Sequence, residues 1–397
     1  MKKIRFSPSV FSVISVVNIP KGRTNKMPTE IKLYLYVFDV FAFILGAIVG
    51  SFLNVCIYRM PLGLSVNEPR RSFCPHCKKQ IPWYRNIPIF SWLLLRGKCV
   101  DCGGRIAFRY FGVELLTAVL FLGLWLKCCS TGIWVLALPY WILAGLLIVA
   151  TFIDFDYFII PDEITLGGTV AGIIMGFAVP VMLQSDSHAK GAFWSVIGAV
   201  VGFLTLRMVV ELGKLAFGKK KIAFDPAETF NWIRHGDDAD LKVGEDTSLW
   251  SDFFERDSDR LIMICPVMEI DGQKHENAKL DFSFNQLIIG EQSFELDKVD
   301  SITGTCSECI IPREAMGLGD VKFISAIGAF LGWQAVFFTI MAGSFIGAFF
   351  GLATILARRR EWSAKIPFGP YLALGALIWM FAGTEIVHWY FSRISAR

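Results

Sequence analysis

Long stretches of apolar residues recur along most of this chain, separated by shorter polar segments. A bilayer core about 30 Å thick needs roughly 20 apolar residues for one helical crossing. Eight stretches approach or reach that length: Leu35 to Tyr58, Phe111 to Cys129, Ile133 to Phe152, Ile164 to Leu183, Ala192 to Leu215, Val321 to Trp333, Val336 to Leu356 and Ile366 to Phe391. The sixth is too short to cross without support from its neighbours. The pattern predicts an all-α polytopic membrane protein with about eight transmembrane helices.

A polar segment of different character separates the fifth and sixth apolar stretches. Residues 222–312 contain 20 acidic and 7 basic residues, a net charge of −13, whereas the whole chain carries +4. Apolar and polar residues alternate there as in strands, and a short apolar run, 287–289, is separated by Gly-Glu-Gln-Ser from the alternating run that contains Phe294 and Leu296. Such a pair of runs is typical of a β-hairpin. We expect a small soluble β-rich or α+β domain inserted at 216–313.

The composition and order of these segments define the regions of the chain. Hydrophobic residues make up 54% of it, above the roughly 45–50% of ordinary soluble domains. We expect an N-terminal basic tail (1–33), a first transmembrane helix (34–60), a cytoplasmic four-cysteine loop (61–110), helices two to five (111–215), the acidic cytoplasmic insertion (216–313) and a block of three helices (314–397). Met1 and Met27 are both candidate start codons.

Basic residues indicate which side of the membrane each loop faces. Short loops rich in Lys and Arg stay in the cytoplasm, and the loop at 61–110 and the one at 357–365 are strongly basic. Counting crossings from them places the end of the third stretch and the start of the sixth at the cytoplasmic face. This count puts both termini outside, whereas the seven basic residues of the first 33 favour an N-terminus inside.

Two Cys-x-x-Cys pairs in the first of these loops have the spacing of a metal site. Cys74 and Cys77 form one pair, and Cys99 and Cys102 form the other after 21 intervening residues. Four thiolates at such spacing hold one tetrahedral zinc ion in zinc ribbons. Two disulfides or four free thiols are the alternatives, and a reducing cytoplasm disfavours disulfides. We predict a structural zinc site with His76 as a bystander.

Carboxylates at a membrane boundary are functional candidates because charge is costly there. Asp154 directly follows an apolar run, and Asp156 and Asp162 stand further along the same segment. Asp156 has a simpler interpretation as a residue facing the aqueous loop, and Asp162, after Pro161, as a helix cap. Asp154 is the hardest of the three to explain as a surface residue, so it is the first catalytic candidate.

The second carboxylate site is the sequence Met316-Gly-Leu-Gly-Asp-Val-Lys322. Its glycines permit irregular backbone or the close approach of another chain, although Gly-x-Gly-Asp also occurs in ordinary turns. The pairing with Asp154 on the same predicted membrane face makes Asp320 the second catalytic candidate. The supporting candidates are Gly317, Gly319, Lys322 and Asp162.

Two carboxylates held together at low dielectric share one proton, so one stays basic and the other acidic. The ionised member can take a proton from water while the protonated member hydrogen-bonds a scissile carbonyl. Because the pair titrates as a unit, both assignments of base and acid remain open. No Ser-His-Asp, HExxH or Walker motif offers a rival mechanism. The chemistry expected is that of an aspartic endopeptidase.

Several blocks of this sequence resemble, in order, the signature blocks of the prepilin peptidase (type IV leader peptidase) family. They are Gly50-Ser-Phe-Leu-Asn-Val-Cys-Ile-Tyr-Arg-Met-Pro61, the four-cysteine loop, Asn86-Ile-Pro-Ile-Phe-Ser-Trp-Leu, Arg96-Gly-Lys-Cys, Arg109-Tyr-Phe-Gly-Val-Glu-Leu-Leu116, Asp154 to Asp162, Gly317 to Lys322 and Ile366-Pro-Phe-Gly-Pro-Tyr-Leu-Ala-Leu-Gly375. The resemblance covers most of the chain apart from the tail and the insertion, where the family usually has a short connection.

The resemblance implies a bifunctional enzyme of the bacterial inner membrane, active at the cytoplasmic face. It would remove the short basic leader of type IV prepilins and type II secretion pseudopilins after a Gly, and then methylate the new N-terminus with S-adenosylmethionine. The family's catalytic aspartates fall on Asp154 and Asp320, and its zinc ligands on the four loop cysteines. The chain has no Gly-rich nucleotide fingerprint, so S-adenosylmethionine is expected from the resemblance alone.

The expected partners are prepilin or pseudopilin substrates, the lipid bilayer and proteins of pilus or type II secretion assembly, with no nucleic acid. The acidic insertion would attract a basic leader, contact a basic partner or be a solvated domain without catalytic duty. Two other functions stay open. One is a presenilin-like Gly-x-Gly-Asp intramembrane protease, which the four-cysteine loop disfavours; the other is a zinc-stabilised membrane scaffold without catalysis.

Overall fold

The computed structural model describes residues 29–69, 72–74, 76–217, 219–236, 238–254, 260–270, 272–312, 317–356 and 367–395. The tail before residue 29 and the basic loop at 357–366, both used above to predict topology, lie outside the described residues. The chain divides into two units. One consists of Met1–Arg207 with Gly317–Arg397, and the other is Met208–Met316.

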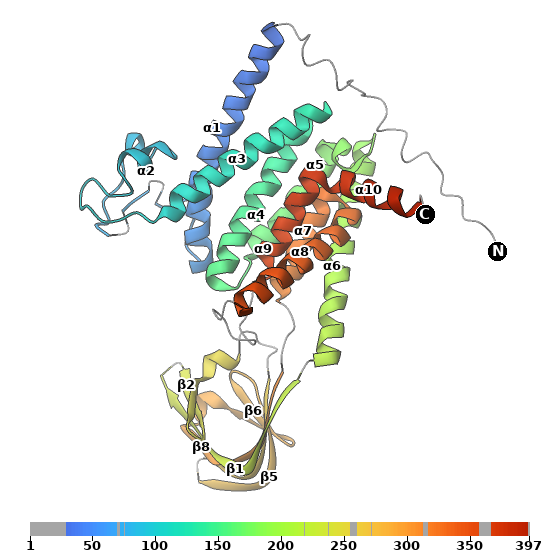
Figure 1. The fold of residues 1–397 in the computed structure, drawn as a ribbon. Helices are drawn as coiled ribbons and strands as arrows, with labels where there is room; N and C mark the ends of the chain where they lie inside the picture. Colours follow the sequence, from blue (N-terminus) through green and yellow to red (C-terminus); the bar gives the residue numbers. More distant parts are fainter. Residues whose placement is uncertain are drawn as a thin grey trace, which may run out of the picture. The chain divides into compact units, whose positions relative to one another are not determined.

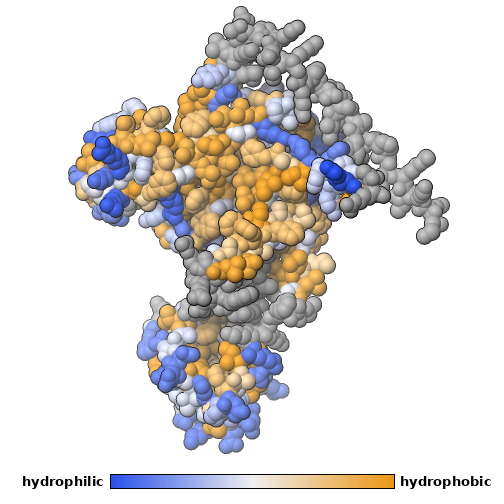
Figure 2. All heavy atoms as spheres, viewed as in Figure 1, coloured by the Kyte–Doolittle hydropathy of each residue, from blue (hydrophilic) through white to orange (hydrophobic). Residues whose placement is uncertain are grey.

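The first unit is helical (Figure 1). Its helices are α1 (Thr29–Arg59), α2 (Phe90–Leu94), α3 (Phe108–Thr131), α4 (Ala137–Tyr157), α5 (Asp162–Ala178), α6 (His188–Phe217), α7 (Leu318–Leu331), α8 (Trp333–Leu356), α9 (Gly369–Ile378) and α10 (Thr384–Ser395), the last two joined by a π-helical turn, Trp379–Gly383. Among the described residues, six helical segments are long and apolar enough to cross a membrane. Hydrophobic residues accordingly cover much of this unit's outer surface (Figure 2).

Each of the eight predicted apolar segments is helical in the structure, and two of the helices are short. α5 has 17 residues and α7 has 14. α5 ends at Ala178 because Pro180 follows, whose ring cannot continue a helix. The remainder of the predicted fourth segment is a 3-10 turn, Pro180–Leu183.

α7 is the buried centre of the helical unit. Every residue from Phe323 to Phe330 is buried, although the helix is too short to span a bilayer by itself. Glycines let its neighbours approach. A Cβ on Gly172 of α5 would lie 2.6 Å from Cβ of Ala329, and one on Gly198 of α6 would lie 2.1 Å from the carbonyl oxygen of Gly328. This tight packing holds α7, which carries Asp320 in its first turn, against α5 and α6.

α1 and α3 pack against each other along their length and carry the four-cysteine loop between them. A Cβ on Gly46 of α1 would lie 2.7 Å from Cα of Ala118, and one on Gly50 would lie 2.8 Å from Cα of Glu114. Asn54 of α1 donates a hydrogen bond to the carbonyl oxygen of Tyr110 at 3.0 Å. The first turns of α3 are therefore a fixed base for the loop.

The second unit is an eight-stranded antiparallel sheet. Its strands are β1 (Lys219–His235), β2 (Asp238–Val243), β3 (Asp246–Leu249), β4 (Leu261–Ile270), β5 (Gln273–Phe282), β6 (Gln286–Ile289), β7 (Gln292–Glu295) and β8 (Ser301–Pro312), in the order β3-β2-β1-β8-β4-β5-β6-β7. β6 and β7 form the predicted hairpin, with Leu287 opposite Phe294. The described residues between β1 and β8 contain no α-helix, so the β-rich alternative is the correct one.

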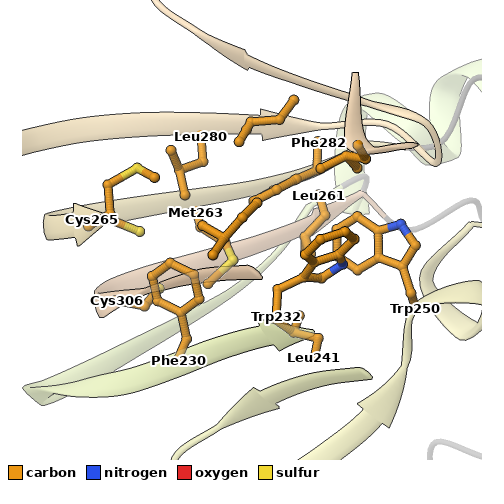
Figure 3. Close-up of a cluster of buried hydrophobic side chains, with 14 of the residues drawn as sticks. Phe230, Trp232, Leu241, Trp250, Leu261, Met263, Cys265, Leu280, Phe282 and Cys306 are labelled. Carbon is orange, nitrogen blue, oxygen red and sulfur yellow. The ribbon is translucent and has the colours of Figure 1, made fainter. Parts of the chain in front are cut away.

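The sheet curls around its own apolar core. The ring of Trp250, which follows β3, lies 5.2 Å from that of Phe282 on β5. These strands are five places apart in the sheet and would be about 24 Å apart if it were flat. Trp232, Met263 and Phe282 meet inside the curl (Figure 3). This core lets the insertion form a unit of its own.

Candidate active site

Asp154 is a buried carboxylate in the last turn of α4, with 5% of its surface exposed. Its Oδ2 accepts a hydrogen bond from the backbone N–H of Gly369 at 2.9 Å. Gly369 is the first residue of α9, so this N–H is one of those that a helix leaves without an internal partner. The start of α9 therefore provides the polar partner that a buried carboxylate needs.

Gly369 leaves no room for a side chain beside Asp154. A Cβ there would lie 2.7 Å from Oδ2 of Asp154 and 3.0 Å from Cδ1 of Ile160. The sequence analysis noted the Ile-Pro-Phe-Gly-Pro block only as a family signature and missed this contact. Its one local signal is a glycine at a helix start, which does not say which distant residue comes close.

Asp320 lies in the first turn of α7, whose capping residue is Gly317 in an extended conformation. Gly319 of α7 lies against Ile160, in the segment that follows Asp154. A Cβ added to Gly319 would lie 3.4 Å from Cβ of Ile160. Ile160 thus contacts both Gly319 and Gly369. Gly369 bonds to Asp154 and Gly319 directly precedes Asp320, so the two carboxylates lie on segments that meet at Ile160. The structure thus brings together the segments that carry the two predicted carboxylates.

Lys322 and Asp162 form an ion pair beside these carboxylates, with Nζ and Oδ1 2.7 Å apart. Asp162 is the first residue of α5, but Pro161 occupies the capping position and no side-chain cap is formed. The helix-cap interpretation of Asp162 is therefore wrong. Its carboxylate instead connects the start of α5 to α7, two residues after Asp320.

Arg109 and Asp156 form a second ion pair, which the sequence analysis did not predict. Arg109 lies in the first turn of α3 and Asp156 near the end of α4. Slightly more than a third of each side chain is exposed. Asp156 does reach the surface, but it also connects the base of the four-cysteine loop to the helix that carries Asp154.

The four loop cysteines converge as the spacing predicted. Their sulfur atoms all lie within 4.8 Å of one another, and those of Cys74 and Cys102 are 3.8 Å apart. Zn–S bonds of about 2.3 Å in a tetrahedron place sulfurs about 3.8 Å apart, so the donor set fits such an ion. His76 is not part of the cluster, and its Nε2 lies 3.1 Å from the carbonyl oxygen of Arg105.

The two cysteine turns share one backbone pattern. The N–H of Lys78 bonds to the carbonyl of Cys74, and the N–H of Gly103 to that of Cys99, both at 2.9 Å. Lys78 and Gly103 both have positive φ, of 59° and 68°. Each turn thus presents its two thiols in the same way, and one ion held by all four would join the two turns.

Glu114 anchors the loop to α3. Its Oε2 accepts a hydrogen bond from the backbone N–H of Ile89 at 2.7 Å, and Ile89 is buried against Ala47 and Ala118. The aromatic ring of Trp92 packs against Phe111 at 5.1 Å. The part of the loop next to α2 is therefore held beside the first two turns of α3.

Comparison with known proteins gives two family matches. Residues 44–128 match the bacterial peptidase A24 N-terminal domain, and residues 141–224 and 285–352 match the type IV leader peptidase family. The second match omits residues 225–284, which form a large part of the curled sheet.

Several curated proteins are similar to this chain, some over nearly its whole length and others over about half of it. A prepilin leader peptidase/N-methyltransferase of Aeromonas hydrophila is 30% identical over 390 residues, which cover 90% of this chain and 94% of that protein. One of Myxococcus xanthus is 41% identical over 186 residues, covering 47% and 52%. A type 4 prepilin-like proteins leader peptide-processing enzyme of Escherichia coli is 38% identical over 199 residues, covering 45% and 71%. No solved structure matches the chain.

Proposed function

The chain belongs to the type IV leader peptidase family, and from this premise we propose that Asp154 and Asp320 are the residues with which it cleaves prepilin leaders. Its activity is that of a prepilin leader peptidase with N-methyltransferase activity. The observation that carries the proposal is that Asp154, buried at the end of α4, and Asp320, in the first turn of α7, lie on segments that meet at Ile160. The substrates we propose are type IV prepilins and type II secretion pseudopilins, cut after a Gly.

The carboxylates would divide the work of peptide hydrolysis. The ionised one takes a proton from water, and the water oxygen attacks the carbonyl carbon of the scissile bond. The protonated one hydrogen-bonds the carbonyl oxygen as it gains negative charge. The C–N bond then breaks, and a proton from the carboxyl pair goes to the leaving nitrogen. The Gly369 N–H keeps Asp154 in place, and the Lys322 pair holds α7 against α5.

We propose that the ion held by Cys74, Cys77, Cys99 and Cys102 is zinc. Four thiolate ligands leave no open position on a tetrahedral ion, so it would supply folding energy to the loop and not a reactive water. S-adenosylmethionine would donate the methyl group to the amine that cleavage exposes. As the new N–C bond forms, the bond from the methyl carbon to the sulfonium sulfur would break, S-adenosylhomocysteine would leave, and the amine would lose a proton.

We propose eight spans, with α5 and α7 crossing inside the bundle, and an active site at the cytoplasmic face of the bacterial inner membrane. The support for this orientation is the basic character of the loop at 61–110, which carries Lys78, Lys79, Arg85, Arg96, Lys98 and Arg105. Prepilins and proteins of pilus or type II secretion assembly are the partners that this placement allows. The acidic sheet unit would then face the same compartment as the basic leader.

A reconstituted cleavage assay tests the function. The full chain is incubated in proteoliposomes with a prepilin that has a Gly-Phe junction, and the products are identified by mass spectrometry. We expect one cut after the Gly, and one added methyl group at the new N-terminus when S-adenosylmethionine is present. A cut inside the apolar segment would instead support a presenilin-like protease, and no cut by the zinc-loaded chain would support a scaffold.

A further inference from the structure

The four-cysteine loop has an exposed apolar face at α2. α2 begins at Phe90, because its capping residue Ile89 has a positive φ of 66°, which is not helical. Side chains three, four and seven positions apart share one face of a helix. The apolar face of α2, as we define it, consists of Phe90, Leu93 and Leu94. Phe90 is 64% exposed and Leu94 is 80% exposed.

α2 lies beside the first two turns of a helix that is long enough to cross the membrane. Trp92 packs against Phe108 and Phe111 of α3, with ring centroids 5.6 Å and 5.1 Å away. The N–H of Ile89 bonds to Glu114, which is about 9 Å along the helix from Phe108. Interfacial helices bury their apolar side to about 5–10 Å at the boundary of headgroups and acyl chains. With the start of α3 at the membrane boundary, α2 would lie at the depth where its apolar face meets lipid.

Basic side chains lie close to this face in the chain. Arg96 and Lys98 follow α2 within four residues, Arg105 is paired with Lys98 through a β-bridge, and all three are exposed. In Figure 2 the region of α2 accordingly shows both hydrophobic and hydrophilic surface. Basic residues next to membrane spans attract anionic lipid headgroups. A basic leader peptide would be repelled here, so the charge favours the bilayer as the occupant.

We propose that the apolar face of α2 inserts into the interfacial layer of the bilayer, with Arg96, Lys98 and Arg105 against anionic phospholipid headgroups. α2 packs on α3, which itself exposes apolar side chains, among them Phe108 and Val119. The four-cysteine loop is thereby held on the membrane surface at two places, through α3 and through α2.

Photo-crosslinking from single positions of the full chain tests this proposal. The photoreactive residue benzoylphenylalanine replaces Leu94, and in a second variant Phe90, in chains reconstituted in nanodiscs. One set of discs contains phosphatidylcholine alone and the other equal parts phosphatidylcholine and phosphatidylglycerol. Val100 is the matched control because it is apolar and 51% exposed but lies in the second cysteine turn, and Leu204 of α6 is the lipid-exposed reference. Metal content equal to that of the wild type shows that the loop is folded.

We expect a peptide with the photoreactive residue at position 94 or 90 to gain the mass of one phospholipid, as does the peptide with the photoreactive residue in place of Leu204. The peptide with the photoreactive residue in place of Val100 should gain no lipid. In mixed discs phosphatidylglycerol should dominate the adducts, and neutralising Arg96, Lys98 and Arg105 together to Gln should remove that preference. Absence of lipid adducts at 94 and 90 despite labelling at Leu204 would overturn the proposal. So would a crosslinked second copy of the chain, or a prepilin adduct in place of lipid. Equal labelling by both lipids would overturn its electrostatic part.

Discussion

The backbone N–H of Gly369 donates a hydrogen bond to Oδ2 of Asp154 at 2.9 Å, across 215 residues of sequence. The contact places the start of α9 against a carboxylate at the end of α4. Because Gly369 has no Cβ, the two helices come closer than any other residue would allow. Gly369 in the Ile-Pro-Phe-Gly-Pro block thereby acquires a physical role, which is to position the carboxylate that we propose to be catalytic.

Replacing Gly369 with Ala should impair cleavage. The new Cβ would lie 2.7 Å from Oδ2 of Asp154, so the carboxylate or the helix must move. A displacement of about 1 Å in a catalytic group can lower the rate by about a hundredfold. We expect a fall in kcat of that order, measured as prepilin processing by reconstituted enzyme. Gly167→Ala in α5 is the matched control, because a Cβ there meets nothing within 4 Å. Equal activity of the two variants would contradict the role assigned to Gly369.

The Lys322–Asp162 pair should matter more for catalysis than for stability. Lys322 is 32% exposed and Asp162 is 57% exposed, and ion pairs that reach solvent contribute roughly 0–1 kcal/mol. We expect Lys322→Ala to lower kcat with little change in thermal stability, and the exchanged pair Lys322→Asp with Asp162→Lys to recover part of the loss. The measurements are kcat and melting temperature for the single and double variants. Purely additive losses in kcat would show that the two side chains act separately.

Metal content should depend on the four loop cysteines and on no other described cysteine. We expect Cys102→Ser to release the ion and to leave the loop more open to proteolysis, because the two turns lose the link between them. Cys129→Ser is the control, since Cys129 lies on α3 outside the cluster. Metal is measured by elemental analysis of purified chains. A bound ion retained by Cys102→Ser at one per chain would contradict the four-thiolate site.

The sequence predicted the local features of this protein better than the long-range ones. Spacing alone identified the four cysteines, because each pair closes a turn within a few residues. The spacing of apolar residues located the helices and the β6–β7 hairpin, because these features too are formed by residues that are close in the sequence. The curl of the sheet and the contact of Gly369 with Asp154 depend on packing between distant segments, about which local patterns contain little. Asp162 was misread as a cap because its partner, Lys322, lies 160 residues away.

Removing most of the acidic sheet should leave the chemical step intact. All proposed catalytic residues belong to the helical unit. β1 and β8 enter and leave the sheet side by side, with Ala223 opposite Glu308, so residues 224–307 can be replaced by a short Gly-Ser linker. We expect kcat within about twofold of the wild type. A large fall in kcat at unchanged protein level would place the sheet in the catalytic machinery.

The same deletion tests whether the acidic sheet attracts a basic leader. Residues 222–312 carry a net charge of −13, and such attraction weakens as salt is added. If the sheet attracts the leader, KM of the wild type rises with salt, whereas KM of the deletion variant does not. The same salt dependence in both proteins would exclude that role.

Prepilin processing by Asp154→Asn and Asp320→Asn tests the central claim most directly. Each variant and the wild type are expressed at equal level, and the mobility shift of a prepilin with a Gly-Phe junction is followed in isolated membranes. Asn keeps the size of the side chain but can neither take nor give the proton, so we expect each variant to lose at least about a thousandfold in rate. Cleavage that survives in either variant at near the wild-type rate would contradict the carboxylate pair.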